Sequence, residues 1–165
     1  MKVIFSHGRE SGPWGSKITR LADAAKDMGF SVDSIDYQDI PDPDLRAKHL
    51  VDLLKDEEGD FLLVGSSMGA YVSLVASEQV DTKGVILLAP ALYMPGYQKQ
   101  SYDSKCSKIE IVHGWSDDVI PVENSIKYAK EIQCSLHLID GDHRLNSSLD
   151  VVEVLFREFL KDMQA

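Results

Sequence analysis

The segment Gly65-Ser66-Ser67-Met68-Gly69 constrains the fold of this chain more than any other. It follows Phe61-Leu62-Leu63-Val64, a short apolar run of the kind that forms a buried parallel strand. The apolar residues after it recur with the spacing of one helix face, at Met68, Tyr71, Val72 and Val75. The glycines suit a tight turn in which larger side chains would collide with the strand and the helix. The pattern predicts a sharp strand-to-helix turn with a serine hydroxyl beside a helix N-terminus, whose free N–H groups can hold developing negative charge.

An acidic residue and a histidine follow two later apolar segments. Ile109–Val112 is predicted to form a strand that ends in an acidic loop, where Asp117 and Asp118 are neighbours. Ser135–Ile139 is predicted to form another strand, which ends in a loop containing His143. Serine, acid and histidine thus occur in the order found in α/β-hydrolases, which differs from the orders in chymotrypsin-like and subtilisin-like proteases.

The N-terminal strand supplies a fourth element. The apolar residues of Lys2–Phe5 run directly into Ser6-His7-Gly8-Arg9, a His-Gly turn at the end of a strand. The α/β-hydrolase fold places its second oxyanion donor at a turn of this kind. We therefore expect the backbone N–H groups of Arg9 and Met68 to form an oxyanion hole.

These four motifs carry a resemblance to the α/β-hydrolase superfamily that extends over nearly the whole chain. Two segments also resemble the small, lidless bacterial esterases of the YqiA type. One is the run from Phe5 to Ile18, Phe-Ser-His-Gly-Arg-Glu-Ser-Gly-Pro-Trp-Gly-Ser-Lys-Ile, and the other is Gly141-Asp142-His143-Arg144-Leu145. The resemblance implies a Ser-His-Asp triad in which Ser67 attacks an acyl carbon, His143 removes its proton and Asp117 orients His143.

Several neighbouring residues compete for these roles. The pattern His-Gly-x-x-Asp-x-x-(Val/Ile)-Pro selects Asp117 by resemblance and leaves Asp118 as a loop or capping residue near the following helix. His7 and His113 precede glycines at strand ends, where they are expected to shape turns or support the site. Arg9 could meet an anionic substrate together with Arg144, and it could equally be a solvated loop residue that matters for its backbone.

Composition is that of a globular protein with one domain. The 165 residues, 44% of them hydrophobic and 27% charged, suffice for one α/β-hydrolase domain over residues 1–165. A net charge of −10 disfavours binding to nucleic acid and to anionic membranes. No apolar run approaches the roughly 20 residues that span a bilayer, and the chain enters its first strand without a visible signal peptide. We expect a cytoplasmic protein whose partner is a small molecule.

Neither a cofactor nor a metal is implied by this chemistry. Cys106 precedes one predicted strand and Cys134 begins the next, and neither has the spacing of a metal site. A disulfide between them is compatible with the sequence, although two reduced thiols fit a cytoplasmic protein better.

Strands and helices alternate along the chain. The remaining predicted strands are Ser31–Tyr37 and Val85–Leu88. Helices are expected from about Ser16 to Gly29, from an Asp42 cap with Pro43 in the first turn, from Pro121, and near the C-terminus with Val152, Leu155, Phe156 and Phe159 inward. Such alternation predicts a parallel sheet with helices on both faces. The fold class is therefore α/β, a minimal α/β-hydrolase fold with six parallel strands in the order 2-1-3-4-5-6 and no cap domain.

The connection between Pro90 and Lys108 is too short for the helical lid that the superfamily inserts there. We expect an open site, partly walled by Tyr93, Met94 or Tyr97, with Trp115 close to it. Such a site favours small or accessible acyl groups.

The function expected from these residues is a serine hydrolase, an esterase that cleaves carboxylic esters with short acyl chains, including thioesters, through an acyl-enzyme. Two alternatives stay open at this point. A serine peptidase or amidase would use the same triad, since fold and triad do not separate ester from amide substrates. A binding protein on a hydrolase scaffold is disfavoured because Ser67, Asp117 and His143 are all present.

Overall fold

The fold is built on one six-stranded sheet in which every neighbouring pair of strands is parallel. The structure, a computed structural model, describes all residues from Met1 to Ala165. The order across the sheet is β2-β1-β3-β4-β5-β6, which confirms the predicted order 2-1-3-4-5-6. The strands are β1 (Lys2–Ser6), β2 (Ser31–Ile35), β3 (Phe61–Ser66), β4 (Gly84–Leu88), β5 (Ile109–Gly114) and β6 (Ser135–Ile139).

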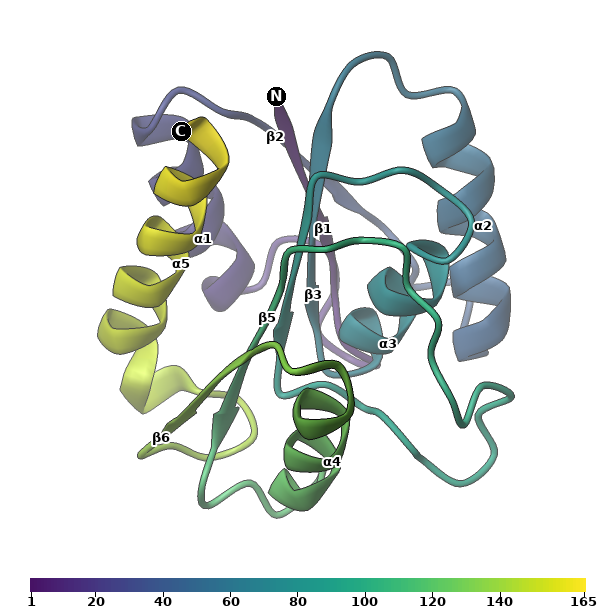
Figure 1. The fold of residues 1–165 in the computed structure, drawn as a ribbon, viewed down its shortest axis with the longest axis vertical. Coiled ribbons are helices and arrows are strands. Elements are labelled where there is room, and N and C mark those ends of the chain that lie inside the picture. The colour runs from purple at the N-terminus through teal and green to yellow at the C-terminus, as the bar shows by residue number, and fades with distance from the viewer.

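Five α-helices cover the two faces of this sheet. Figure 1 shows α1 and α5 on one side and α2, α3 and α4 on the other. The helices are α1 (Ser16–Asp27), α2 (Pro43–Lys55), α3 (Met68–Ala76), α4 (Val122–Ile132) and α5 (Leu149–Gln164), with a short 3-10 turn, η1 (Asn146–Ser148), before α5. None of them combines the length and the apolar character that crossing a bilayer requires.

Two separate hydrophobic cores fill the space between the sheet and the helices. Because side chains alternate along a strand, Val3 and Phe5 of β1 enter the core under α1 and α5. Ile4 of the same strand enters the core under α2, α3 and α4. The predicted inward residues of α5 behave as expected, since Val152 and Phe156 are fully buried in the first of these cores.

Local sequence signals account for where the elements begin and end. Asp42 caps α2 as predicted, because its side chain accepts hydrogen bonds from the N–H groups of Asp44 and Leu45, and Pro43 occupies the first turn. The predicted strand Ser31–Tyr37 is too long: β2 ends at Ile35. Its backbone leaves the ladder there because the N–H of Tyr37 donates to His7 Nε2 instead of to a strand.

Helix α3 differs from its expected one-sided pattern. All nine of its residues are buried, not only the stripe that contains Met68 and Val72. It lies between the sheet, α2 and the connection 91–108, so that it has no solvent face. A helix apolar all round is the expected result for an element enclosed on every side.

The connection between β4 and β5 is a short, anchored loop. Tyr71 of α3 receives the Tyr97 ring edge-on at 4.7 Å, and its hydroxyl accepts the Lys99 N–H at 3.0 Å. Tyr102 packs edge-on against Tyr71 and Tyr128. This loop contains no helix, in agreement with the predicted absence of a cap domain.

Candidate active site

Ser67 sits at the junction of β3 and α3 with a backbone that other residues rarely adopt. Its φ of 56° and ψ of −117° place it in a strained conformation. Neither flanking glycine could be larger: a Cβ on Gly65 would lie 2.3 Å from the Gly69 carbonyl oxygen, and one on Gly69 would lie 2.0 Å from that of Ser6. The two glycines therefore allow β3, α3 and β1 to approach closely enough to form the turn.

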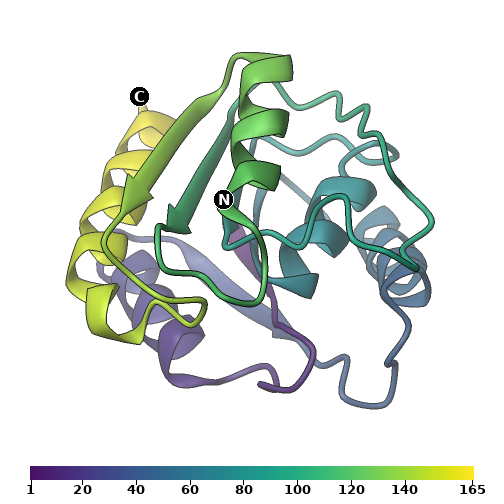
Figure 2. The same cartoon turned by 90° about the horizontal axis from the view of Figure 1, so that it is seen from below.

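A hydrogen-bonded chain links the serine, the histidine and the acid. Ser67 Oγ lies 3.0 Å from His143 Nε2, and His143 Nδ1 lies 2.8 Å from Asp117 Oδ2. Figure 2 looks onto the edge at which β5 and β6 end, where the acidic loop and the histidine loop lie beside each other. The Ser116 N–H joins these two loops by donating to the Gly141 carbonyl at 3.0 Å.

The Asp117 side chain is completely buried and fully hydrogen-bonded. Its Oδ1 accepts the N–H groups of Val119 at 2.9 Å and Ile120 at 2.8 Å, and its Oδ2 accepts from His143. Burial by itself would raise the pKa of Asp117, but these hydrogen bonds stabilise the carboxylate and hold the pKa below its ordinary value. The carboxylate is therefore ionised when His143 donates to it, which fixes the imidazole with its Nε2 free to accept a proton. Asp118 makes none of these contacts.

A second histidine stands behind Asp117. His113 is completely buried, and its Nε2 lies 3.0 Å from Asp117 Oδ2. Ser125 Oγ lies 2.6 Å from His113 Nδ1, an arrangement in which the serine hydroxyl donates and Nε2 carries the proton. Burial lowers the pKa of His113, so that this ring is a neutral donor to Asp117. The structure thus gives His113 the supporting position expected of it.

The loop after β1 runs alongside Ser67. A Cβ placed on Gly8 would lie 3.6 Å from the Ser67 Cβ, which shows how near this loop comes to the serine. The Arg9 N–H makes no hydrogen bond within the protein. Met68 is the first residue of α3, where N–H groups have no partner in the helix. Met68 thus directly follows Ser67, and Arg9 directly follows Gly8, the loop residue that lies beside Ser67.

His7 holds this loop in place through hydrogen bonds of both its ring nitrogens. It is completely buried, and its Nε2 accepts the Tyr37 N–H at 2.9 Å. The proton is therefore on Nδ1, which donates to the Gly8 carbonyl at 2.6 Å. Burial lowers the pKa of His7 and keeps the ring neutral.

Two cationic residues flank the histidine loop. Lys17 Nζ donates to the Arg144 carbonyl at 3.1 Å and so ties this loop to the first turn of α1. Burial lowers the pKa of Lys17 to about 8, although Asp142 and Asp117 oppose the shift. The Arg144 side chain itself is exposed.

The predicted substrate-binding residues are not joined to the triad by any hydrogen bond or ring contact. The Tyr93 ring lies under Lys127 Nζ at 4.0 Å and its hydroxyl donates to Glu131 at 3.4 Å, so that it packs against α4. Trp115 is 59% exposed, and its backbone N–H bonds to Ile139. Met94 is half-buried in the connection 91–108.

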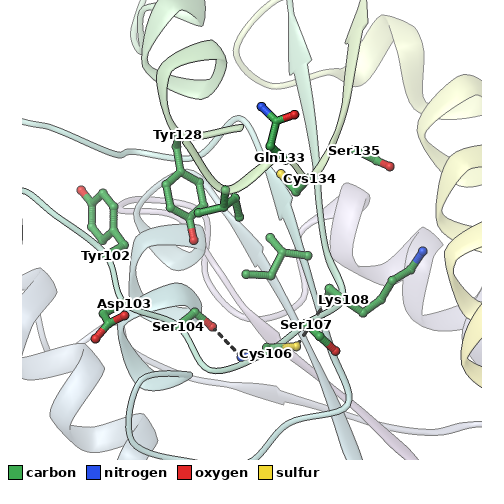
Figure 3. A pocket seen from close by; sticks show the side chains of 12 residues that line it. Tyr102, Asp103, Ser104, Cys106, Ser107, Lys108, Tyr128, Gln133, Cys134 and Ser135 are labelled. Atoms are coloured by element: carbon green, nitrogen blue, oxygen red, sulfur yellow. Dashed lines mark hydrogen bonds between the residues drawn. The ribbon is translucent and has the colours of Figure 1, made fainter. Parts of the chain in front are cut away.

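A cavity of about 420 Å³ lies at the opposite end of the sheet. It opens where β5 and β6 begin, whereas the triad lies where strands end. Figure 3 shows Tyr102 and Tyr128 on one side of it, with Cys106 and Cys134 on separate wall segments. Both cysteines are free, so the disulfide left open by the sequence is not formed. Nowhere do three His, Cys, Asp or Glu side chains gather in a way that could hold a metal ion.

Arg46 is the residue near the site that the sequence pattern did not single out. It is 1% exposed and its guanidinium donates to backbone carbonyls of the loop after β1. The sequence does contain an indication of its burial, because Arg46 precedes Leu50 by one helix turn and thus lies on the apolar face of α2. A charged residue on such a face marks a buried polar contact.

Comparison with known proteins places this arrangement in a family. Residues 2–104 match the uncharacterised protein family UPF0227. A solved structure from Xanthomonas campestris pv. campestris, assigned to the α/β-hydrolase superfamily, is 31% identical to the chain with a TM-score of 0.90, and the match covers 98% of each chain. No curated protein sequence matches significantly.

More distant structures share the fold. A serine hydrolase without a lid from the same Xanthomonas species is 21% identical, with a TM-score of 0.77 over 98% of this chain and 81% of its own. Est1E from Butyrivibrio proteoclasticus, which has also been solved with ferulic acid bound, is 20% identical with a TM-score of 0.79, over 98% of this chain and 87% of its own. The sheet order, the turn at Ser67 and these matches lead to one conclusion: the chain belongs to UPF0227, within the α/β-hydrolase superfamily.

Proposed function

We propose that this protein is a serine esterase that cleaves carboxylic esters with small or accessible acyl groups, using Ser67, His143 and Asp117 as its triad. The observation that carries the proposal is the continuous hydrogen-bonded chain from Ser67 through His143 to Asp117, with distances of 3.0 and 2.8 Å. A serine hydroxyl is a weak nucleophile until an adjacent base accepts its proton, and this chain supplies that base with its orienting acid.

The reaction begins when His143 Nε2 takes the Ser67 proton and Oγ attacks the acyl carbon. The oxyanion that forms accepts hydrogen bonds from the N–H groups of Arg9 and Met68, and each such donor is worth about 10²–10³ in rate. His143 then gives the proton to the leaving alcohol, which leaves an ester between Ser67 and the acyl group. Water attacks this ester as His143 accepts its proton, and His143 then returns that proton to Ser67 Oγ as the carboxylic acid leaves.

The substrate class follows from the surroundings of Ser67. No helix covers the turn, and tyrosine contacts hold the connection 91–108 against α3. Esters with short acyl chains and esters of bulkier acids both have access to such a site. Thioesters fit the same mechanism, because the acyl carbon and the developing oxyanion are placed in the same way.

Hydrolysis of 4-nitrophenyl acetate, 4-nitrophenyl butyrate and methyl ferulate by the wild type and by Ser67→Ala tests the proposal. We expect the substitution to reduce kcat by at least about 10³-fold. Ser66→Ala is the matched control, since Ser66 lies in the same turn and has no role in the mechanism; its kcat should stay near that of the wild type. Circular dichroism verifies that both variants are folded.

Equal activity of Ser67→Ala and the wild type would overturn the proposal. Cleavage of 4-nitroanilides in preference to the esters, with dependence on Ser67, would instead assign the triad to a peptidase or amidase.

A further inference from the structure

The side chain of Arg46 is buried without an acidic partner. It extends from the first turn of α2 and is 1% exposed, and all the hydrogen bonds of its guanidinium go to backbone carbonyls rather than to a carboxylate. The nearest acid on its helix, Asp44, is bound to the Tyr71 hydroxyl and to the Gln98 N–H. Burying a cation without a counter-ion costs free energy that packing alone does not return. Other polar groups must therefore stabilise the guanidinium.

Backbone carbonyls take the place of the missing acid. Nε donates to the Ile40 carbonyl at 2.5 Å. Nη1 donates to Gly8 at 3.1 Å and to His7 at 3.4 Å, and Nη2 donates to Arg9 at 3.4 Å. The Tyr37 ring faces the guanidinium, with its centroid 5.4 Å from Cζ. One planar group thus holds three consecutive carbonyls of the loop that passes Ser67.

Of these three carbonyls, that of Gly8 is the one connected to a predicted oxyanion donor. It belongs to the same peptide unit as the Arg9 N–H, which has no partner in the protein and lies in the loop beside Ser67. It accepts from both Arg46 and His7 Nδ1. Rotating this peptide by half a turn would break both hydrogen bonds and point a carbonyl oxygen, in place of an N–H, toward the serine.

We propose that Arg46 is a positioning residue of the oxyanion hole, which holds the Gly8–Arg9 peptide so that the Arg9 N–H faces the acyl oxygen, and which strengthens that N–H as a donor. This inference rests on the proposed esterase function. The strengthening follows because a carbonyl that accepts a charge-assisted hydrogen bond polarises its own amide. Arg46 does not touch the substrate, and its effect reaches the reaction through one peptide bond.

The test compares Arg46→Met with Leu50→Ala and with the wild type. Leu50→Ala is the matched control because it truncates a fully buried side chain of the same helix and destabilises the protein without removing a hydrogen bond to the loop. For 4-nitrophenyl butyrate we expect Arg46→Met to lower kcat by about 10- to 100-fold, a share of what a complete oxyanion donor is worth, with KM within about twofold. Leu50→Ala should keep kcat at temperatures at which it is folded.

A second measurement follows the peptide itself and needs no substrate. Residual dipolar couplings report the direction of the Arg9 N–H, and the carbonyl ¹³C shift of Gly8 reports its hydrogen bonding. Both should change in Arg46→Met and remain unchanged in Leu50→Ala. Arg46→Lys, which retains a cation able to reach one carbonyl, should fall between Arg46→Met and the wild type in kcat and in the Gly8 shift, and it replaces Arg46→Met if that variant does not fold.

The kinetic assay and the NMR measurement distinguish failure of the esterase function from failure of the positioning role of Arg46. An unchanged N–H direction and Gly8 shift in the Arg46 variants would overturn the positioning role, whatever the esterase assay gives. A wild type that hydrolyses no ester would overturn the esterase function, while the spectra would still decide whether Arg46 holds the peptide. A fall in kcat that Leu50→Ala matches would reduce Arg46 to a stabilising residue.

Discussion

Among single residues, Asp117 has the most completely satisfied side chain of the site. Its two oxygens accept from His143, His113, Val119 and Ile120. In the proposed mechanism such a carboxylate both orients His143 and stabilises the imidazolium that forms. Asp118 is adjacent in sequence and shares none of these contacts, so that a substitution of Asp118 is a control for the same substitution of Asp117.

Asp117→Asn should therefore reduce kcat strongly, by about 10⁴-fold, because an amide in this position favours the wrong tautomer of His143. Asp118→Asn removes the same charge from the neighbouring position and should leave kcat within about twofold of the wild type. The assay is steady-state hydrolysis of 4-nitrophenyl butyrate at pH 7.5. Comparable losses in the two variants would remove Asp117 from the triad.

The buried histidines give the stability a pH dependence of predictable sign. Burial lowers the pKa of both His7 and His113 in the folded protein, whereas an unfolded histidine has a pKa of about 6.5. Below that pH the unfolded chain binds protons that the folded protein does not, so the free energy of unfolding falls as the pH decreases. It is insensitive to these two groups above about pH 7.5.

Urea unfolding between pH 7.5 and 5.5 measures this slope, and His113→Asn should make it shallower while leaving the behaviour above pH 7.5 parallel to the wild type. A slope identical in the two proteins would show that His113 is protonated equally in the folded and unfolded states.

Sequence motifs marked some residues near the candidate site and missed others. Ser67 and His143 were identifiable because each follows a strand and belongs to a short motif. Arg46 was not, because its function depends on which carbonyls lie above α2, and those come from a loop distant in sequence. The contacts of Tyr93 with α4 escaped prediction for the same reason.

At the scale of elements, the close contact of β3, α3 and β1 is the tightest constraint on the fold. Gly69→Ala would force a Cβ to within 2.0 Å of the Ser6 carbonyl oxygen, where backbone on both sides leaves no room to move. We expect a loss in the free energy of unfolding of about 3 kcal/mol or more.

Gly15→Ala is the control for this substitution, since Gly15 has an ordinary φ of −61° and its nearest neighbour would lie 3.6 Å from the new Cβ. Its effect should stay below about 1 kcal/mol. Chemical denaturation of both variants gives the comparison, and a Gly69→Ala protein as stable as the wild type would contradict the packing of this turn.

The order of the elements followed from the sequence, and their extent did so only in part. Apolar runs predicted the central strands, because parallel strands buried on both faces are almost wholly apolar, and the alternation with helical stripes predicted the part-exposed edge strands β2 and β6. The end of β2 was misplaced because a hydrogen bond to His7, invisible to periodicity, draws the Tyr37 backbone out of the ladder. Helix α3 showed a stripe, although its enclosure by other elements buries it completely.

At the scale of the whole molecule, the absence of a lid has a kinetic consequence. The connection 91–108 is fastened to α2 and α3 through Asp44 and Tyr71. We expect the rate with 4-nitrophenyl butyrate to rise smoothly with concentration and to show no jump where the substrate passes its solubility limit. A steep increase at that point would indicate a segment that opens at an interface.

The proposed triad and the cavity lie at opposite ends of the sheet. Loops at the carboxyl ends of the strands carry Ser67, Asp117 and His143, while the cavity with both cysteines lies at the other end. The family resemblance predicted triad residues at the carboxyl ends of the strands, and this assignment stays a prediction. The cavity could not be predicted, because a cavity depends on how side chains fail to fill space rather than on any motif.

The Ser67 backbone is bound into the centre of the sheet. Its N–H donates to the Leu88 carbonyl at 2.9 Å, and its own carbonyl accepts the N–H groups of Ala70 at 3.0 Å and Ala91 at 3.1 Å. Breaking these backbone hydrogen bonds of Ser67 therefore requires that β3 separates from β4 and that the start of α3 unwinds at the same time. The amide of Ser67 should exchange its hydrogen only when the entire protein opens, and heat inactivation of the enzyme should proceed at the rate of its global unfolding.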